Sequence, residues 1–179
     1  MKTIYLIRHA ETEALRDGLL AGSGFDTPLT EEGRSQAKEV GKLLANYEID
    51  TIVSSPMSRT RETAGIIATV IGYKQENIQL NKLFVERSYG PYEKISFKEF
   101  VKEYENNNLL DGVETTEELY ERVARSFDWL RQLDGERILL VTHGSVGRMI
   151  ILLSQNKRHD EHKNIKSIGT AEVVELTLD

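Results

Sequence analysis

The sequence contains no cysteine, and this absence excludes several kinds of chemistry at once. Disulfide bonds, thiolate zinc sites and thiol nucleophiles all require that side chain. Long hydrophobic runs are also lacking, because no segment approaches the roughly 20 apolar residues of a membrane-spanning helix. The apolar stretch from Thr3 to Ile7 stops at Arg8 and is too short for the core of a signal peptide. We therefore expect a cytoplasmic protein with no membrane partner.

Positive charge is in the minority. Lys and Arg number 23 against 29 Asp and Glu, which gives a formal net charge of −6. A general nucleic-acid binder needs a broad basic face, so we expect no nucleic-acid partner. A small basic pocket is still compatible with an acidic surface. The length of 179 residues is sufficient for one domain with a substantial core, and we predict a single domain over 1–179.

Strand-like and helix-like segments alternate along the chain. This pattern predicts an α/β fold, a three-layer α/β/α sandwich whose central sheet is mostly parallel and has helices on both faces. Ser55 is expected to cap the second helix, with Pro56 at its first position. The expected strands are 2–7, 50–55, 78–84, 137–143 and 171–178, and the expected helices are 30–47, 56–71, 96–106, 115–133 and 145–155.

Two of the predicted strands deliver a histidine at their carboxyl ends. His9 follows the strand 2–7, and His143 ends the segment 137–143. Ligands of open α/β sheets bind outside the carboxyl ends of the strands. If the two strands are parallel neighbours, both imidazoles converge in one crevice, and the strand 50–55 brings Arg59 to the same edge.

Arg8, His9, Arg59 and His143 together would make an anion site that needs no metal. The guanidinium fork suits phosphate oxygens, and a neutral imidazole nitrogen can attack phosphorus to form a phosphohistidine. A nearby carboxylic acid would then protonate the leaving alkoxide. From the residues alone, a second interpretation is open: strand-end histidines bonded to loops, and surface arginines paired with acids.

Five blocks of sequence, in order and spanning nearly the whole chain, resemble the histidine phosphatase superfamily, also called phosphoglycerate-mutase-like. The resemblance implies that His9 is the nucleophile and Glu86 the proton donor. It also implies that Arg8, Arg59 and His143 form the phosphate pocket together with Gly144. The blocks are "LIRHAET" at 6–12, "DTPLTEEGRSQA" at 26–37, "SSPMSRTRETA" at 54–64, "LFVERSYGPYE" at 83–93 and "LLVTHGSVGRMI" at 139–150.

The family spacing also decides between neighbouring candidates. Arg59 and Arg61 lie two residues apart on one predicted helix and point about 200° apart, so only one of them faces the crevice. The resemblance selects Arg59. Glu93 is interpreted as structural, because Lys94 follows it where the family usually has glycine.

The sequence departs from the family pattern on one side of the phosphate pocket. Leu15 stands where many members have an asparagine that helps to hold phosphate, and Ser23 stands at a usual glycine position. We expect backbone amides of Gly22, Ser23 or Gly24 to compensate. Glu114, with Thr115 beside it, is expected to line the substrate entrance.

The run "KRHDEHK" at 157–163 contains His159, Asp160 and His162, which could form a metal site. A charged run after an apolar helix is more typical of a solvated loop, so we expect no metal and no cofactor.

The cap segment, about 87–118, is short compared with the larger insertions of phosphoglycerate mutases. The resemblance therefore implies the compact phosphatase branch, such as alpha-ribazole phosphatases and broad-specificity phosphatases. The expected partner is a small phosphorylated metabolite. Phosphoglycerate mutase, protein phosphohistidine phosphatase and a non-catalytic phospholigand-binding module stay open as alternatives, and the oligomeric state is not predicted.

Overall fold

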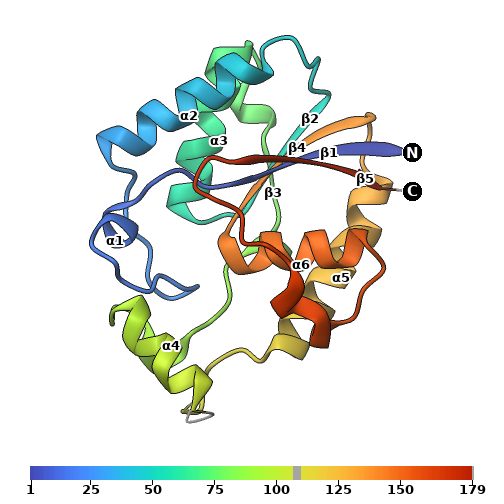
Figure 1. Cartoon of the computed structure of the whole chain (residues 1–179). Coiled ribbons are helices and arrows are strands. Elements are labelled where there is room, and N and C mark those ends of the chain that lie inside the picture. Colours follow the sequence, from blue (N-terminus) through green and yellow to red (C-terminus); the bar gives the residue numbers. More distant parts are fainter. Residues whose placement is uncertain (107–109, 179) are drawn as a thin grey trace.

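The computed structural model describes residues 1–106 and 110–178. Its five strands form one sheet in the order β3–β2–β4–β1–β5. The first four in that order are parallel, and β5 runs antiparallel to β1 at the edge (Figure 1). The strands are β1 (Lys2–Arg8), β2 (Thr51–Ser54), β3 (Gln79–Leu80), β4 (Arg137–Thr142) and β5 (Val173–Leu178).

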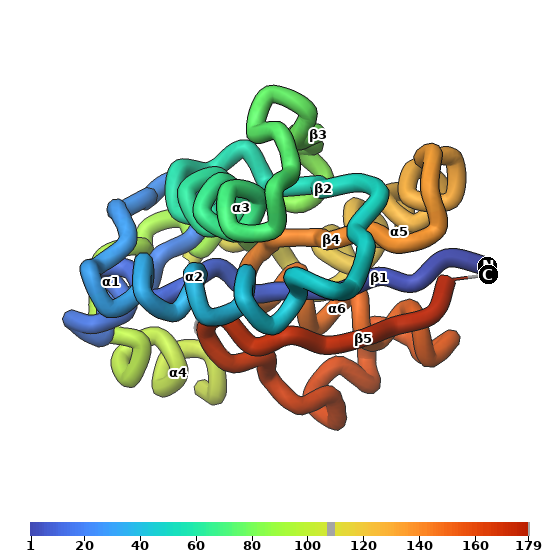
Figure 2. Tube along the Cα trace, turned by 90° about the horizontal axis from the view of Figure 1, so that it is seen from above, coloured from blue at the N-terminus to red at the C-terminus, as the bar shows by residue number. Residues whose placement is uncertain are grey.

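Helices cover both faces of this sheet. On β1, Tyr5 and Ile7 join one buried cluster and Ile4 and Leu6 join the other, as the two-residue period of a strand requires. The pair α2 and α3 packs against the first cluster, and α5 and α6 pack against the second (Figures 1 and 2). The predicted three-layer α/β/α sandwich is confirmed. These helices are α2 (Glu31–Leu44), α3 (Ser58–Ile71), α5 (Thr116–Gln132) and α6 (Gly144–Ser154).

Two further helices lie away from the sandwich, close to each other in both views (Figures 1 and 2). They are α1 (Glu13–Arg16) and α4 (Phe97–Glu105). The amide of Phe97 donates to the carbonyl of Gly18 at 2.9 Å, which ties the start of α4 to the loop after α1. A small apolar cluster of Leu20, Tyr89, Tyr92 and Phe100 fills the space beneath α4.

Local sequence signals gave most of these elements correctly. The capping boxes at Ser96 and Thr115 form as expected at the starts of α4 and α5. The prediction for the start of α3 was wrong, because the helix begins at Ser58 and Met57 occupies the cap position. The third strand is also shorter than expected, since residues 82–84 turn into a 3₁₀ helix capped by Asn81. Within the described part of the chain, no helix is both long and apolar enough to cross a membrane.

Candidate active site

His9 and His143 lie side by side because the strands that carry them are hydrogen-bonded neighbours. Arg8 of β1 pairs with Thr142 of β4, and the amide of His9 donates to the Thr142 carbonyl at 2.8 Å. The two imidazole ring centroids are 5.3 Å apart. The predicted convergence of the two histidines is confirmed, and it follows directly from the parallel pairing.

The hydrogen bonds of His9 define its tautomer. Its Nδ1 lies 2.8 Å from the carbonyl oxygen of Ala10, which can only accept, so Nδ1 carries the proton. Nε2 is then left with a free lone pair. Burial, together with the positive charges of Arg59 and Arg8, holds the pKa of His9 well below its usual range. The ring is therefore neutral near pH 7, which is the form that a nucleophile requires.

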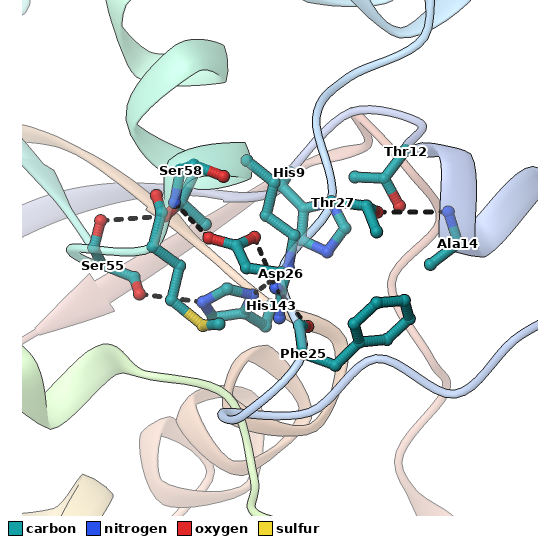
Figure 3. Close-up of polar contacts among 12 residues, drawn as sticks. His9, Thr12, Ala14, Phe25, Asp26, Thr27, Ser55, Ser58 and His143 are labelled. Atoms are coloured by element: carbon teal, nitrogen blue, oxygen red, sulfur yellow. Dashed lines mark hydrogen bonds and ion pairs between the residues drawn. The ribbon is translucent and has the colours of Figure 1, made fainter. Parts of the chain in front are cut away.

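His143 has the opposite tautomer. Arg59 donates from Nε to Nδ1 of His143 at 3.2 Å, so the proton of this ring is on Nε2. Nε2 in turn donates to the Oγ of Ser55 at 2.8 Å (Figure 3). Burial and the nearby Arg59 charge hold the pKa of His143 well below its usual range. Both nitrogens of His143 are therefore engaged, whereas Nε2 of His9 is free.

Arg59 is completely buried behind the two histidines, and Asp26 balances its charge. Its Nη1 donates to Asp26 at 2.8 Å, and its Nη2 donates to the carbonyl of Gly22 at 3.1 Å. The other carboxylate oxygen of Asp26 accepts the amide of Ser58 at 2.6 Å (Figure 3). Asp26 therefore caps α3 from a distant loop, in place of the Ser55 side chain that the sequence predicted. Although burial opposes it, these bonds and the Arg59 charge lower the pKa of Asp26.

Arg8 presents an unused donor. Its Nη1 donates to the carbonyl of Ile168 at 3.1 Å. Its Nε is buried and has no hydrogen-bond partner in the described residues. A buried donor without a partner is costly unless a ligand accepts from it, and an anion is the natural acceptor for a guanidinium. The first residue of α6, Gly144, lies against this group, so the positive end of the helix dipole adds to the same field.

Glu86 lies at the base of the same site and is 6% exposed. One of its carboxylate oxygens accepts the amide of Arg87 at 2.8 Å, and the other accepts the amide of Ser145 at 3.3 Å. The hydroxyl of Tyr89 is 2.7 Å from the Oγ of Ser145. Burial and the nearby Glu86 carboxylate raise the pKa of Tyr89 to about 12, so Tyr89 is a neutral hydroxyl at physiological pH.

A cavity of about 540 Å³ opens above these groups. Arg8, His9 and Glu86 line its base, whereas Arg59 and His143 lie beneath it and do not reach its wall. Leu15 lines the cavity at the position where the family asparagine was expected. The volume is in the range of small-molecule sites.

Two of the predicted binding residues line a second cavity. Ser23 and Glu114 belong to this cavity of about 880 Å³. The amide of Ser23 donates to the carbonyl of Arg87 at 3.2 Å. Both carboxylate oxygens of Glu114 accept from Arg122, each at 2.8 Å. Glu86 lines both cavities, and neither Ser23 nor Glu114 lines the 540 Å³ cavity.

The preference for Arg59 over Arg61 and the structural role of Glu93 agree with the geometry. Arg61 is exposed while Arg59 is buried, so one arginine of the pair faces the site. Glu93 accepts the amides of Gly24 at 3.2 Å and Tyr89 at 3.3 Å, which fits a structural role. The Gly24 amide is thereby occupied.

The sequence did not lead us to expect Arg87 among the residues that line the cavity. This residue is 8% exposed, and its Nε donates to the carbonyl of Glu114 at 2.6 Å. Its guanidinium lies over the rings of Tyr89 and Tyr104. The one signal in the sequence was its place directly after Glu86.

Part of the run 157–163 differs from the expected solvated loop. His162 and Lys163 belong to the 3₁₀ helix His159–Asn164, and both line the 540 Å³ cavity. Over residues 1–106 and 110–178, no three His, Asp or Glu side chains are grouped so that they could hold a metal ion.

Comparison with known proteins places these features in a family. The model of the histidine phosphatase superfamily (branch 1) matches residues 4–179. A relative from Escherichia coli named "probable phosphoglycerate mutase GpmB" is 35% identical over 155 residues, which cover 80% of this chain and 70% of that protein.

Solved structures show the same fold. YhfR of Bacillus stearothermophilus superposes with a TM-score of 0.85 at 23% identity, covering 100% of this chain and 92% of that one. A putative alpha-ribazole-5'-P phosphatase from Escherichia coli superposes with a TM-score of 0.86 at 24% identity, with the same coverage. The match to the family model over nearly the whole length, together with the paired histidines, shows that this chain belongs to the histidine phosphatase superfamily.

Proposed function

We propose that the protein is a metal-independent phosphatase that hydrolyses small phosphomonoesters through a phosphohistidine on His9. The observation that carries the proposal is the state of this imidazole. Its Nδ1 lies 2.8 Å from the Ala10 carbonyl, which leaves Nε2 free, and its ring lines the cavity beside the unpartnered Nε of Arg8.

In the first step, Nε2 of His9 attacks phosphorus and the ester P–O bond breaks. Negative charge on the transferring phosphoryl oxygens is stabilised by Arg8, by the charge of Arg59 and by the amino end of α6 at Gly144. His143, fixed by Arg59 and Ser55, packs against His9 and holds that ring in place beneath the phosphate pocket. No metal is needed for this step, because the positive charges come from side chains and the helix dipole.

Glu86 is assigned as the proton donor. In its protonated form it gives a proton to the leaving alkoxide, and it becomes a carboxylate that accepts the amides of Arg87 and Ser145. The same carboxylate then takes a proton from water. The water oxygen attacks phosphorus, the P–N bond breaks, and inorganic phosphate leaves with His9 restored.

The test is hydrolysis of a chromogenic phosphate ester in the presence of a chelator. We expect full activity of the wild-type protein with EDTA, and loss of at least about 1000-fold in kcat for His9→Ala. Glu86→Gln keeps the size of the side chain and should lose activity most strongly with esters of poorly acidic alcohols, because those need the proton most. Full activity in His9→Ala would refute the proposal.

A second candidate function is phosphoglycerate mutase, and the 35% identity to a protein of that name favours it. A mutase must keep water away from the phosphohistidine, and the short cap of this chain argues for hydrolysis instead. Phosphoglycerate labelled in its phosphate separates the two reactions. Release of free phosphate supports the phosphatase, and positional exchange without release supports the mutase.

A further inference from the structure

The cavity above His9 holds more positive charge than one phosphate group can balance. Arg8, Arg87, Arg148 and Lys163 line it, and Glu86 is the one carboxylate among its described lining residues. A phosphate monoester brings between one and two negative charges at neutral pH. This excess is notable in a chain whose formal net charge is −6.

Two of these cations lie away from the phosphate end. Arg148 follows Gly144 by four residues on α6, which places it on the same helix face and about 6 Å further along the axis. Its guanidinium donates to the hydroxyl of Ser167. Lys163 enters from the 3₁₀ helix His159–Asn164, with its Nζ 6.0 Å from the ring centroid of Tyr104. Throughout the described chain, neither cation has a carboxylate within ion-pair distance.

Much of the remaining cavity lining is apolar. It comes largely from α1 with the loop that follows it and from the cap helix α4, and none of these segments places a carboxylate on it. An apolar wall of this kind binds a carbon framework and offers no partner to polar groups. The residues that form it include Leu15, Leu20, Phe97, Phe100 and Val101.

We propose that the substrate is an organic phosphate with a second acidic group, a carboxylate or a further phosphate, separated from the transferred phosphate by an apolar framework. Arg148 and Lys163 bind the second acidic group, and Leu15, Phe97 and Phe100 contact the framework. This proposal rests on the proposed function, since it takes His9 as the phosphate end of the cavity. It also gives the charged run 157–163 a role in choosing the substrate.

The experiment compares four esters on one framework: 4-(carboxymethyl)phenyl phosphate, its methyl ester, the matching phosphonomethyl compound and phenyl phosphate. The methylene group insulates the reacting oxygen, so the acidity of the leaving group changes little across the set. We expect kcat/KM to be at least 10-fold higher for an acidic compound than for the methyl ester. The carboxylate and phosphonate arms show which acidic group is preferred.

Arg148→Gln should reduce this preference to less than about threefold, and Lys163→Gln should reduce it in part. Lys166→Gln is the matched control, because Lys166 is an exposed lysine in the following loop that does not line this cavity. It should keep the full preference. Equal rates for the acidic compound and the methyl ester in the wild type would overturn the proposal, as would an unchanged preference in Arg148→Gln.

Failure of the proposed function is distinguishable from failure of this inference. If none of the esters is hydrolysed, the phosphatase assignment fails. Binding of two phosphonates that cannot be hydrolysed, 4-(carboxymethyl)benzylphosphonate and its methyl ester, then tests the second acidic group by calorimetry. A 10-fold tighter binding of the acid that Arg148→Gln abolishes supports the inference, and equal binding refutes it.

Discussion

Neutralising Asp26 tests how the buried charge of Arg59 is tolerated. The Asp26→Asn variant keeps an oxygen that can accept the Ser58 amide, but it removes the negative charge and the oxygen that accepts from Nη1 of Arg59. Arg59 has a side chain that is 0% exposed, whereas that of Asp26 is 28% exposed. Breaking a fully buried ion pair costs about 3–5 kcal/mol, and the partial exposure of Asp26 reduces this to about 2 kcal/mol.

Asp26→Ala removes the helix cap as well as the charge. Because Met57 cannot cap α3 through its side chain, the amide of Ser58 loses its acceptor at 2.6 Å. Loss of a helix cap costs about 1 kcal/mol, so we expect a total loss of about 3 kcal/mol. For a chain of this size, each kcal/mol lowers Tm by roughly 2–4 °C.

The assay is equilibrium unfolding in guanidinium, followed by the fluorescence of the single tryptophan, Trp129. Asp17→Asn serves as the control, because Asp17 forms an exposed pair with Arg16 and its loss should leave the midpoint unchanged. Arg59 also donates to the carbonyls of Phe25 at 3.3 Å and Gly22 at 3.1 Å. If Asp26→Asn unfolds at the wild-type midpoint, these carbonyls suffice for Arg59 without a counter-charge, and our account of this pair is wrong.

Three further perturbations have defined outcomes. Because burial lowers the pKa of both His9 and His143 in the folded state, the unfolded state binds more protons below pH 6.5. The free energy of unfolding should therefore be constant above pH 6.5 and fall below it by up to about 1.4 kcal/mol per pH unit for each histidine. Denaturation at pH 5.5–7.5 measures this dependence. A constant free energy down to pH 5.5 would show that the histidines can take up protons in place. Gly33→Ala places a Cβ 2.1 Å from the backbone oxygen of Glu11 and should lower the free energy of unfolding by about 2–3 kcal/mol in the same assay. An unchanged free energy of unfolding would mean that the backbone at Glu11 shifts freely. Leu15→Asn should lower kcat/KM for aromatic phosphate esters by about three- to fivefold, and an unchanged value would remove Leu15 from the substrate wall.

The sequence predicted the centre of this site because the centre depends on strands. An apolar run that stops at Arg8 and His9, and another that stops at His143, could be placed on one sheet edge without knowing the fold in detail. Parallel pairing of β1 and β4 then made the two imidazoles neighbours. Helix caps such as Ser96 and Thr115 were equally predictable, because each depends on contacts three residues apart.

The remainder depends on contacts that local patterns do not encode. The cap of α3 comes from Asp26, 32 residues earlier in the chain, so the nearby Ser55 was the wrong choice. Arg87, Arg148 and Lys163 come from three separate segments, and only tertiary packing brings them to one cavity. Ser23 was placed by analogy with a family position, but its amide is used by the carbonyl of Arg87.

The central claim is that His9 carries the phosphoryl group. Its most direct test is to mix the protein with a phosphate ester labelled in its phosphorus, quench within milliseconds in alkali and locate the label by peptide mapping. We expect label that is stable to alkali and labile to acid on the peptide that contains His9, and none in His9→Asn. Turnover by the wild type with no such label at any quench time, or the same label in His9→Asn, would contradict the account.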